Sequence, residues 1–381
     1  MNNQEQKNKI RVGLVYGGRS GEHEVSLQTA LAVSKAFDYD KYELIPFYIT
    51  YTGQWRSGAL LNAPPTAVAQ LQFDPGSDSG AEESNNALYP VLRGISDVET
   101  AVQASREDQV IDVMFPLLHG TFGEDGTIQG LFEMAGLPYV GAGVLASSVG
   151  MDKVAMKMMF AQAGLPQVGY RHFVGYQWKK DREHCLNNVE ELGYPCFVKP
   201  ANLGSSVGVS KARNREELIV AIEEALRFDR KVIIEEFVDA REIEVSVLGN
   251  DDPRASVPGE IMSSHEFYDY KAKYTDGKSV MVIPAEIDQE TTNAVRSMAV
   301  RAFQAIDGSG LCRADFFMRR SDGALFINEV NTLPGFTPYS MYPLMWQETG
   351  MPYRELLDTL IRLAVERHAE RQSLEYGNGA L

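Results

Sequence analysis

The sequence contains few cysteines, few basic residues and no long apolar run. Its three cysteines, Cys185, Cys196 and Cys312, lack paired or CxxC spacing, so we expect reduced thiols and a cytoplasmic location. Lysine and arginine total 36 against 52 aspartates and glutamates, and the formal charge of −16 argues against nucleic acid or an anionic membrane as a general partner. Residues 1–9 are polar and no segment approaches membrane-spanning length, so neither a signal peptide nor a membrane span is expected.

Two familiar phosphate-binding motifs are missing as well. A glycine turn at 17–21 lies between a buried-strand pattern at 10–16 and a helix pattern from about 22 to 37, but it is not GxGxxG and gives weak support for a dinucleotide site. The Gly-Ser stretch at 201–208 lacks GxxxxGK[ST], so it is not a P-loop. The order strand, glycine turn, helix still predicts an α/β domain that can hold an anion at a helix N-terminus.

The length of 381 residues predicts two or three domains. Strand patterns at 42–49 and 110–118 and a helix pattern at 127–135 predict a first domain that ends near residue 145. His119 follows the second of these strands, at the edge where α/β sheets bind ligands, which favours a site over a structural role. Apolar periodicity then predicts helices at 151–163, 215–227, 291–306 and 353–367, and strands at 194–199, 231–238, 241–248 and 256–261.

Residues 312–340 carry the most informative pattern. Alternation of side chains places Arg313 and Asp315 on one face of a first strand, and Glu329 and Asn331 on one face of a second. A glycine-containing turn between them predicts an antiparallel hairpin. The loop after the second strand is rich in glycine, proline and hydroxyl residues, and it offers backbone N–H groups beside the hairpin.

The turn sets the register of this hairpin. A three-residue loop at 321–323 pairs Arg320 with Ala324 and thereby places Asp315 opposite Glu329. Two opposed carboxylates repel each other and need a cation between them. Hard oxygen ligands of this kind suit Mg²⁺ or Mn²⁺ bridging phosphates. The alternative is a surface hairpin whose polar side chains are simply solvated.

Further residues support a phosphate site. Lys153 opens a helix, and Lys199 ends a strand just before the Gly-Ser stretch, whose N–H and hydroxyl groups can cover phosphate oxygens. Taken alone, that stretch fits a flexible hairpin, but the adjacent lysine favours the phosphate interpretation. Glu22 either holds a substrate ammonium or interacts with the helix dipole. The aromatic and basic loop at 265–277 is typical of a lid. Together these features predict ATP held by lysines and Mg²⁺ and directed at a small acceptor.

Over about residues 10–368, the chain resembles the D-alanine–D-alanine ligase family of the ATP-grasp superfamily. The matching stretches are GGRSGEHEVS at 17–26, HGTFGEDGTIQG at 119–130, MDK at 151–153, FVKPANLGSSVGVSK at 197–211, FYDYKAKY at 267–274, and RADF with NEVNTLPGFTPYS in the hairpin. The resemblance implies an α/β protein of three domains: an α/β N-terminal domain (1–145) and two α+β domains (146–240 and 241–381) that enclose ATP. It also implies a homodimer.

The resemblance further implies roles for individual residues. Glu22 would bind the ammonium of the first D-alanine, with His119 near that substrate. Arg313 and the Gly335 N–H would stabilise the oxyanion, and Ser340 would bind the carboxylate of the second D-alanine. Ser205 and Tyr274 would join Glu22 in a network of hydrogen bonds over the site. Nucleotide ligands would be Lys153, Lys199, Ser205, Ser206, Glu235, Phe237, Val238, Glu242 and Lys273, and metal ligands for two ions would be Asp315, Glu329 and Asn331.

The implied reaction is the ligation of two D-alanine molecules through a D-alanyl phosphate, for peptidoglycan precursor synthesis. The inventory of residues agrees with it, because a carboxylate reacts with an amine only after its oxygen becomes a better leaving group. Mg²⁺, lysines and Arg313 would offset charge during that activation. Alternatives are a ligase that makes D-alanyl-D-lactate or D-alanyl-D-serine, another ATP-grasp carboxylate–amine ligase, and a nucleotide-binding module without activity.

Overall fold

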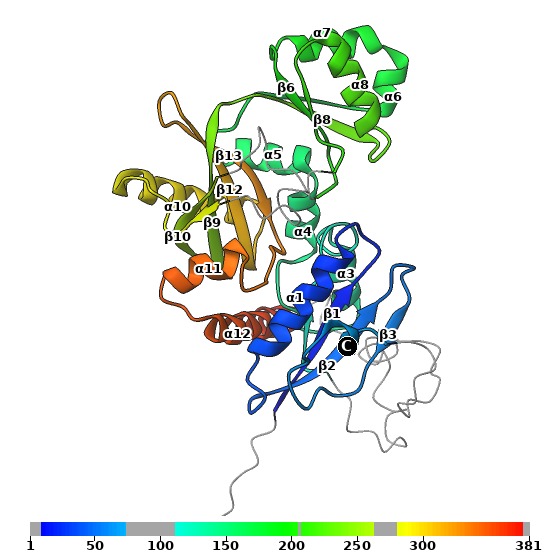
Figure 1. Cartoon of the computed structure of the whole chain (residues 1–381), viewed down its shortest axis with the longest axis vertical. Helices are drawn as coiled ribbons and strands as arrows, with labels where there is room; N and C mark the ends of the chain where they lie inside the picture. Colours follow the sequence, from blue (N-terminus) through cyan, green and yellow to red (C-terminus); the bar gives the residue numbers. More distant parts are fainter. Residues whose placement is uncertain (1–8, 74–110, 205–206, 263–279, 376–381) are drawn as a thin grey trace, which may run out of the picture.

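The computed structural model describes residues 9–73, 111–204, 207–262 and 280–375. Its strands form three sheets, which lie one after another along the long axis of the molecule (Figure 1). One end of that axis is a lobe that carries α6, α7 and α8, and the N-terminal sheet lies toward the other end. Among the described residues, no helix combines the length and the apolar character needed to cross a membrane.

The first sheet has the order β3-β2-β1-β4, and β1 pairs in parallel with both β2 and β4. Buried apolar side chains fill the parallel strands, as predicted for a sheet covered on both faces. Gly17 ends β1 with a φ of 89°, and a Cβ atom there would lie 2.1 Å from the Ile49 carbonyl oxygen, so the turn requires glycine. The elements are β1 (Ile10–Gly17), α1 (His23–Ala36), β2 (Tyr42–Ile49), β3 (Trp55–Ser57), the 3-10 helix η1 (Val68–Leu71), β4 (Val113–Pro116) and α3 (Thr127–Met134).

The second sheet is antiparallel throughout, with the order β5-β8-β6-β7, and it packs on the helices of the lobe. The predicted strands at 194–199 and 231–238 and the predicted helix at 215–227 are present with bounds shifted by a few residues. The first strand and two helices of this lobe were not predicted. The elements are β5 (Tyr170–Val174), α6 (Gly175–Lys180), α7 (Arg182–Glu190), β6 (Cys196–Pro200), β7 (Ser210–Ala212), α8 (Arg215–Ala225) and β8 (Lys231–Glu236).

The third sheet has the order β11-β10-β9-β12-β13, and all its pairs are antiparallel. One core beneath it combines apolar residues of the sheet, of α10 and of α4 and α5. The helix predicted at 151–163 is present with slightly shorter bounds. A preceding helix that was not predicted meets it at Asp152, whose carboxylate accepts hydrogen bonds from the N–H groups of Val154 and Ala155. The elements are α4 (Val144–Met151), α5 (Lys153–Gln162), β9 (Ala240–Gly249), β10 (Arg254–Met262), β11 (Val280–Val282), α10 (Gln289–Ala305), β12 (Gly310–Arg319) and β13 (Leu325–Asn331).

Two helices complete the chain, α11 (Met341–Glu348) and α12 (Tyr353–Gln372). The latter is longer than predicted, and its apolar face shares one core with the N-terminal sheet. Figure 1 shows α12 beside α1. The packing of α12 on the N-terminal sheet joins segments that are far apart in the sequence. The domain limits at residues 145 and 240 stay a prediction. The lid predicted at 265–277 lies outside the described residues.

Candidate active site

The hairpin of β12 and β13 places the predicted metal ligands as expected. Asp315 pairs with Glu329, and Arg313 pairs with Asn331. Alternation is also confirmed, because Ala314 and Val330 point into the buried core while the four polar residues are only half-buried. Asn331 Nδ2 donates a hydrogen bond to Asp315 Oδ2 at 2.9 Å. Two carboxylates and an amide therefore converge on one face of the hairpin.

The predicted turn is wrong, although the pair that it was meant to produce is correct. The Arg319 N–H donates to the Ala324 carbonyl at 2.9 Å, so the loop has one residue more than the predicted 321–323. Continued without interruption, this register would place Asp315 opposite Asn328. A β-bulge next to Asp315 accommodates Asn328 as an extra residue on β13 and restores the pairing with Glu329.

Arg313 lies between two carboxylates. Its Nε and Nη2 donate to Asp315 Oδ1 and Oδ2 at 2.7 and 2.8 Å, and its Nε lies 3.0 Å from Glu244 Oε2. Burial alone would lower the pKa of Arg313, but Asp315 and Glu244 raise it well above its usual value. The arginine is thus permanently charged and is held by both carboxylates.

The donors present fit a divalent cation that binds with phosphate oxygens. Asp315, Glu329 and Asn331 offer carboxylate and amide oxygens, which Mg²⁺ and Mn²⁺ prefer. In the described part of the chain, no group of three or more His, Cys, Asp or Glu side chains is arranged to hold a metal alone.

The two predicted phosphate lysines lie on different elements. Lys153 starts α5, and its Nζ donates to the Leu203 carbonyl at 2.9 Å and lies 3.7 Å from Glu329 Oε2. Lys199 is on β6, and its Nζ lies 2.5 Å from Glu235 Oε2. Burial alone would lower the pKa of Lys199, whereas Glu235 and Glu329 raise it. Lys199 is therefore cationic at neutral pH, and both lysines lie near the Glu329 carboxylate of the hairpin.

Glu235 has a second lysine partner that was not predicted. Lys157 Nζ lies 2.9 Å from Glu235 Oε1, and the two residues are 1% and 3% exposed. Burial alone would raise the pKa of Glu235, but Lys157 and Lys199 lower it below its usual value. The Glu235 carboxylate, which was predicted to lie beside the adenine, therefore forms ion pairs with two lysines.

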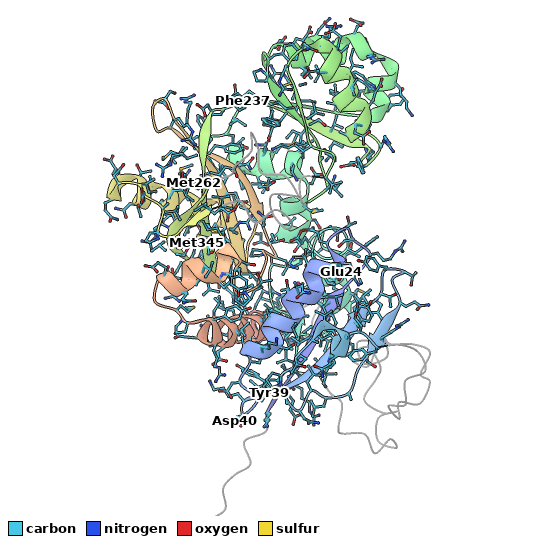
Figure 2. All side chains as sticks on the ribbon, in the orientation of Figure 1. Glu24, Tyr39, Asp40, Phe237, Met262 and Met345 are labelled. Carbon is cyan, nitrogen blue, oxygen red and sulfur yellow. The ribbon has the colours of Figure 1, made fainter. Side chains whose placement is uncertain are left out.

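A cavity of about 460 Å³ connects these groups. Phe237 and Met262, which both line it, are labelled in Figure 2 between the lobe of the second sheet and the N-terminal part of the molecule. Phe237 is 39% exposed, and the ammonium of Lys211 lies 4.4 Å from its ring centre. The predicted residues that line this cavity are Lys153, Lys199, Glu235, Phe237, Val238, Glu242, Arg313, Asp315, Glu329 and Asn331.

The predicted site for the first amino acid lies at the end of the N-terminal sheet. A Cβ atom added to Gly120 would lie 3.0 Å from Glu22 Oε2, and one added to Gly204 would lie 3.4 Å from the same oxygen. Glycine at both positions therefore lets the backbone approach the Glu22 carboxylate closely. Burial lowers the pKa of His119, although the charge of Glu22 opposes the shift. Gly204 also lines the cavity, so this site and the nucleotide site share a wall.

Glu124 is a second carboxylate at this end, and the sequence analysis did not identify it. Its Oε2 accepts a hydrogen bond from the Gly120 N–H at 3.0 Å, and it lines the cavity. Burial and the nearby charge of Glu22 raise the pKa of Glu124 to about 8. A positive charge placed between Glu22 and Glu124 would relieve this repulsion.

Gly335 and Ser340 lie together in the loop after β13. A Cβ atom on Gly335 would lie 3.1 Å from Ser340 Oγ, and that hydroxyl also accepts a hydrogen bond from the Thr337 N–H at 3.0 Å. Ser340 is the residue before α11, whose N-terminus favours a carboxylate. A hydrogen bond between His119 and the Leu333 backbone links this loop to the first amino-acid site. Ser205, Ser206, Lys273 and Tyr274 lie outside the described residues.

Sequence comparisons agree with the geometry. The family model described as "D-ala D-ala ligase N-terminus" matches residues 11–142, and the one described as "D-ala D-ala ligase C-terminus" matches residues 159–362. A D-alanine--D-alanine ligase of Bacillus cytotoxicus is 57% identical over 97% of this chain and 99% of its own length. One of Listeria monocytogenes is 50% identical, with coverages of 97% and 99%.

Solved structures agree as well. The D-alanine-D-alanine ligase from Coxiella burnetii superposes with a TM-score of 0.74 at 33% identity, covering 96% of both chains. The VanG D-Ala:D-Ser ligase from Enterococcus faecalis gives a TM-score of 0.77 at 34% identity, covering 94% of this chain and 100% of that one. The predicted α/β fold of several domains, of the ATP-grasp type, is thereby confirmed. The chain belongs to the D-alanine–D-alanine ligase family and is an ATP-dependent ligase.

Proposed function

We propose that this chain joins two D-alanine molecules through a D-alanyl phosphate, using ATP, to make D-alanyl-D-alanine for peptidoglycan precursors. The observation that carries the proposal is one cavity whose walls bring together Lys153 and Lys199 and the carboxylates of Asp315 and Glu329. Glu22 lies at the end of that cavity, against Gly204. A triphosphate and an amino acid can therefore be held against each other.

Nucleotide binding uses the following residues. Lys153 and Lys199 contact the phosphates, and Lys273 contacts the γ-phosphate. Phe237 and Val238 flank the adenine and Glu242 binds the ribose. For Glu235, whose carboxylate lies 2.5 Å from the Lys199 ammonium, we propose a role in holding that lysine. Ser205 and Ser206 cover the phosphate oxygens.

Asp315, Glu329 and Asn331 would hold two Mg²⁺ or Mn²⁺ ions, which when bound offset charge on the phosphates during phosphoryl transfer. The protein groups then carry the amino-acid chemistry. Glu22 binds the ammonium of the first D-alanine and thereby aims its carboxylate at the γ-phosphate, with His119 beside it. Holding the two reacting groups in a fixed geometry lowers the entropic part of the reaction barrier.

The second step is attack of the uncharged amine of the second D-alanine on the acyl phosphate, through a tetrahedral oxyanion. As the oxyanion collapses, the bond between the acyl carbon and the phosphate oxygen breaks, phosphate leaves and the nitrogen loses a proton. Arg313 and the Gly335 N–H donate to that oxyanion, and Ser340 binds the carboxylate of the attacking D-alanine. Ser205 and Tyr274 join Glu22 in the hydrogen bonds that close the site. Loss of one oxyanion donor typically raises the barrier by about 3 kcal/mol. We further propose a homodimer and a cytoplasmic location; sedimentation of the purified chain tests the first.

The primary test measures phosphate release from ATP with a panel of small D- and L-amino acids. D-alanine should give the highest rate and D-alanyl-D-alanine as product, whereas the same preference for an L-amino acid would contradict the proposal. Hydroxylamine added to ATP and D-alanine should form D-alanine hydroxamate. A second candidate, D-alanyl-D-serine synthesis, is favoured by the similarity to the VanG D-Ala:D-Ser ligase. Competition between D-alanine and D-serine, with analysis of both products, separates the two.

A further inference from the structure

Three carboxylates form a row across the face of the third sheet that lines the cavity. Glu244 of β9 pairs with Asp315 of β12, and Asp315 pairs with Glu329 of β13. Asp315 and Glu329 belong to the proposed metal site. Glu244 has no role in the proposed mechanism, yet it is only 5% exposed and lines the same cavity. A buried carboxylate in this position needs a cationic partner.

That partner is Arg313, which Glu244 shares with Asp315. Both oxygens of Asp315 accept hydrogen bonds from the guanidinium, while Glu244 Oε2 lies 3.0 Å from Arg313 Nε. A carboxylate that accepts hydrogen bonds on both oxygens from an arginine has fewer lone pairs left for a metal ion. Binding of an ion by Asp315 therefore competes with its pairing to Arg313.

We propose that Glu244 is a positioning residue that keeps Arg313 in place when Asp315 leaves the arginine to bind a metal ion. This inference rests on the proposed metal site. A guanidinium that loses its only partner inside a protein is strongly destabilised, and Glu244 prevents that loss because it already lies beside Arg313 before the exchange. The arginine then remains at the hairpin, near the reacting groups, while Asp315 turns to the ion.

The exchange makes Glu244 matter for metal binding only through Arg313. Without Glu244, the pair with Asp315 is the ion pair that the described residues leave to the arginine, and an incoming ion competes with it. Without Arg313, Asp315 is available to the ion and Glu244 no longer acts on the metal site through the arginine. A direct ligand, in contrast, would contribute equally whether or not the arginine is present.

The test is a double-mutant cycle on Mn²⁺ affinity, measured by electron paramagnetic resonance in the presence of ADP, with the full chain. Glu244→Gln should weaken Mn²⁺ binding about tenfold in the parent, and less than about twofold in the Arg313→Met background. Asp322→Asn is the matched control, because Asp322 forms the same two-oxygen pair with Arg319 on the same hairpin, at 2.8 and 2.7 Å, outside the cavity. This control should leave Mn²⁺ affinity unchanged.

Equal weakening in both backgrounds would make Glu244 a direct ligand and overturn the exchange, as would an unchanged affinity in the parent background. If Arg313→Met does not fold, Glu244→Asp replaces it: the shorter residue keeps its charge near the ion but reaches Arg313 less well. Weaker Mn²⁺ binding by that variant supports the exchange, and unchanged binding refutes it. Asp315→Asn identifies a failure of the underlying metal site, because Mn²⁺ binding that survives this change places the ion elsewhere.

Discussion

Two groups of charged side chains lie at the cavity, and they have opposite compositions. In one group Glu235 lies between Lys157 and Lys199, so two lysines share one carboxylate. In the other group Arg313 lies between Glu244 and Asp315, so two carboxylates share one cation. The first group has positive charge in excess and the second has negative charge in excess.

This difference suits a ligand of mixed charge, in which anionic phosphates are bound together with a divalent cation. Surplus positive charge at Lys199 is complementary to phosphate oxygens, and surplus negative charge at Asp315 is complementary to a divalent ion. Each group is held by ion pairs before the ligand arrives, so less ordering is required on binding. An overall charge of −16 is therefore compatible with phosphate binding, because the local charge differs from the global one.

Removing a carboxylate from the group with excess negative charge should have the largest effect on activity. Asp315→Asn leaves the fold intact but removes a proposed metal ligand, and we expect turnover to fall about 10,000-fold, or about 5.5 kcal/mol in the barrier. Phosphate release at limiting Mg²⁺ is the measurement. Asp322→Asn should retain parental activity. Undiminished turnover by Asp315→Asn at limiting Mg²⁺ would remove this residue from the metal site.

Removing the carboxylate from the group with excess positive charge should mainly lower the stability of the fold. Glu235→Gln removes the carboxylate that lies 2.9 Å from the buried Lys157 ammonium and 2.5 Å from that of Lys199, and we expect a loss of about 3–5 kcal/mol in the free energy of unfolding. Urea unfolding at neutral pH measures it. The control is Glu191→Gln, which removes the exposed partner of Arg171 and should cost about 0–1 kcal/mol. Equal losses for the two variants would mean that burial of the first group has no energetic consequence.

The hairpin of β12 and β13 shows how much of the site could be predicted from the sequence. The pairing of Asp315 with Glu329 was predicted although the turn was one residue too short in the prediction, because a bulge at Asn328 compensates for the longer loop. Alternation fixes which face a side chain takes, but it does not show an inserted residue. The correct pair thus followed from an incorrect turn.

The residues that were missed share a physical cause. Glu244 reaches Arg313 because β9 lies next to β12, and Lys157 reaches Glu235 because α5 lies near β8; neither neighbour relation follows from local periodicity. Some signal was present, since Lys157 interrupts an otherwise apolar stretch and Glu244 shares a face with the predicted Glu242. A charged residue on a buried face needs a partner, but the sequence does not state which one.

A further prediction concerns Glu124, a carboxylate near the first amino-acid site. Because the pKa of Glu124 is raised to about 8, the folded state binds a proton that the unfolded state releases above about pH 4.5. Stability contributed by this proton is complete below about pH 4.5 and is lost as pH rises through about 8. Glu124→Gln should remove about 3 kcal/mol of that decrease, measured by urea unfolding at about pH 5.5 and 8.5.

The control for this prediction is Asp322→Asn. The pKa of Asp322 is lowered to about 2, first by its hydrogen bond with Arg319, so this residue does not titrate in the same range. Its variant should lose stability with pH as the parent does. A parental decrease that persists in Glu124→Gln would assign the effect to other groups.

The smallest effect concerns the rim of the nucleotide site. Lys211→Met removes the cation above Phe237, an interaction worth about 0.5–1 kcal/mol at an exposed ring. We expect the KM for ATP to rise about two- to fivefold with kcat unchanged. Lys180→Met, which removes a comparable cation 6.0 Å from the Tyr176 ring on the outer lobe, is the control. A change in kcat rather than KM would separate Lys211 from nucleotide binding.

The helix α12 determines when this chain can finish folding during its synthesis. The core beneath the N-terminal sheet contains Val12 and Leu14 together with Leu360 and Ala364, and Lys41 is paired with Asp358 at 2.7 Å. These strands therefore keep part of their apolar surface uncovered until α12 has been translated. Domains that are made first usually fold first. Here the N-terminal sheet completes its core only after α12 has left the ribosome, more than 300 residues after β1.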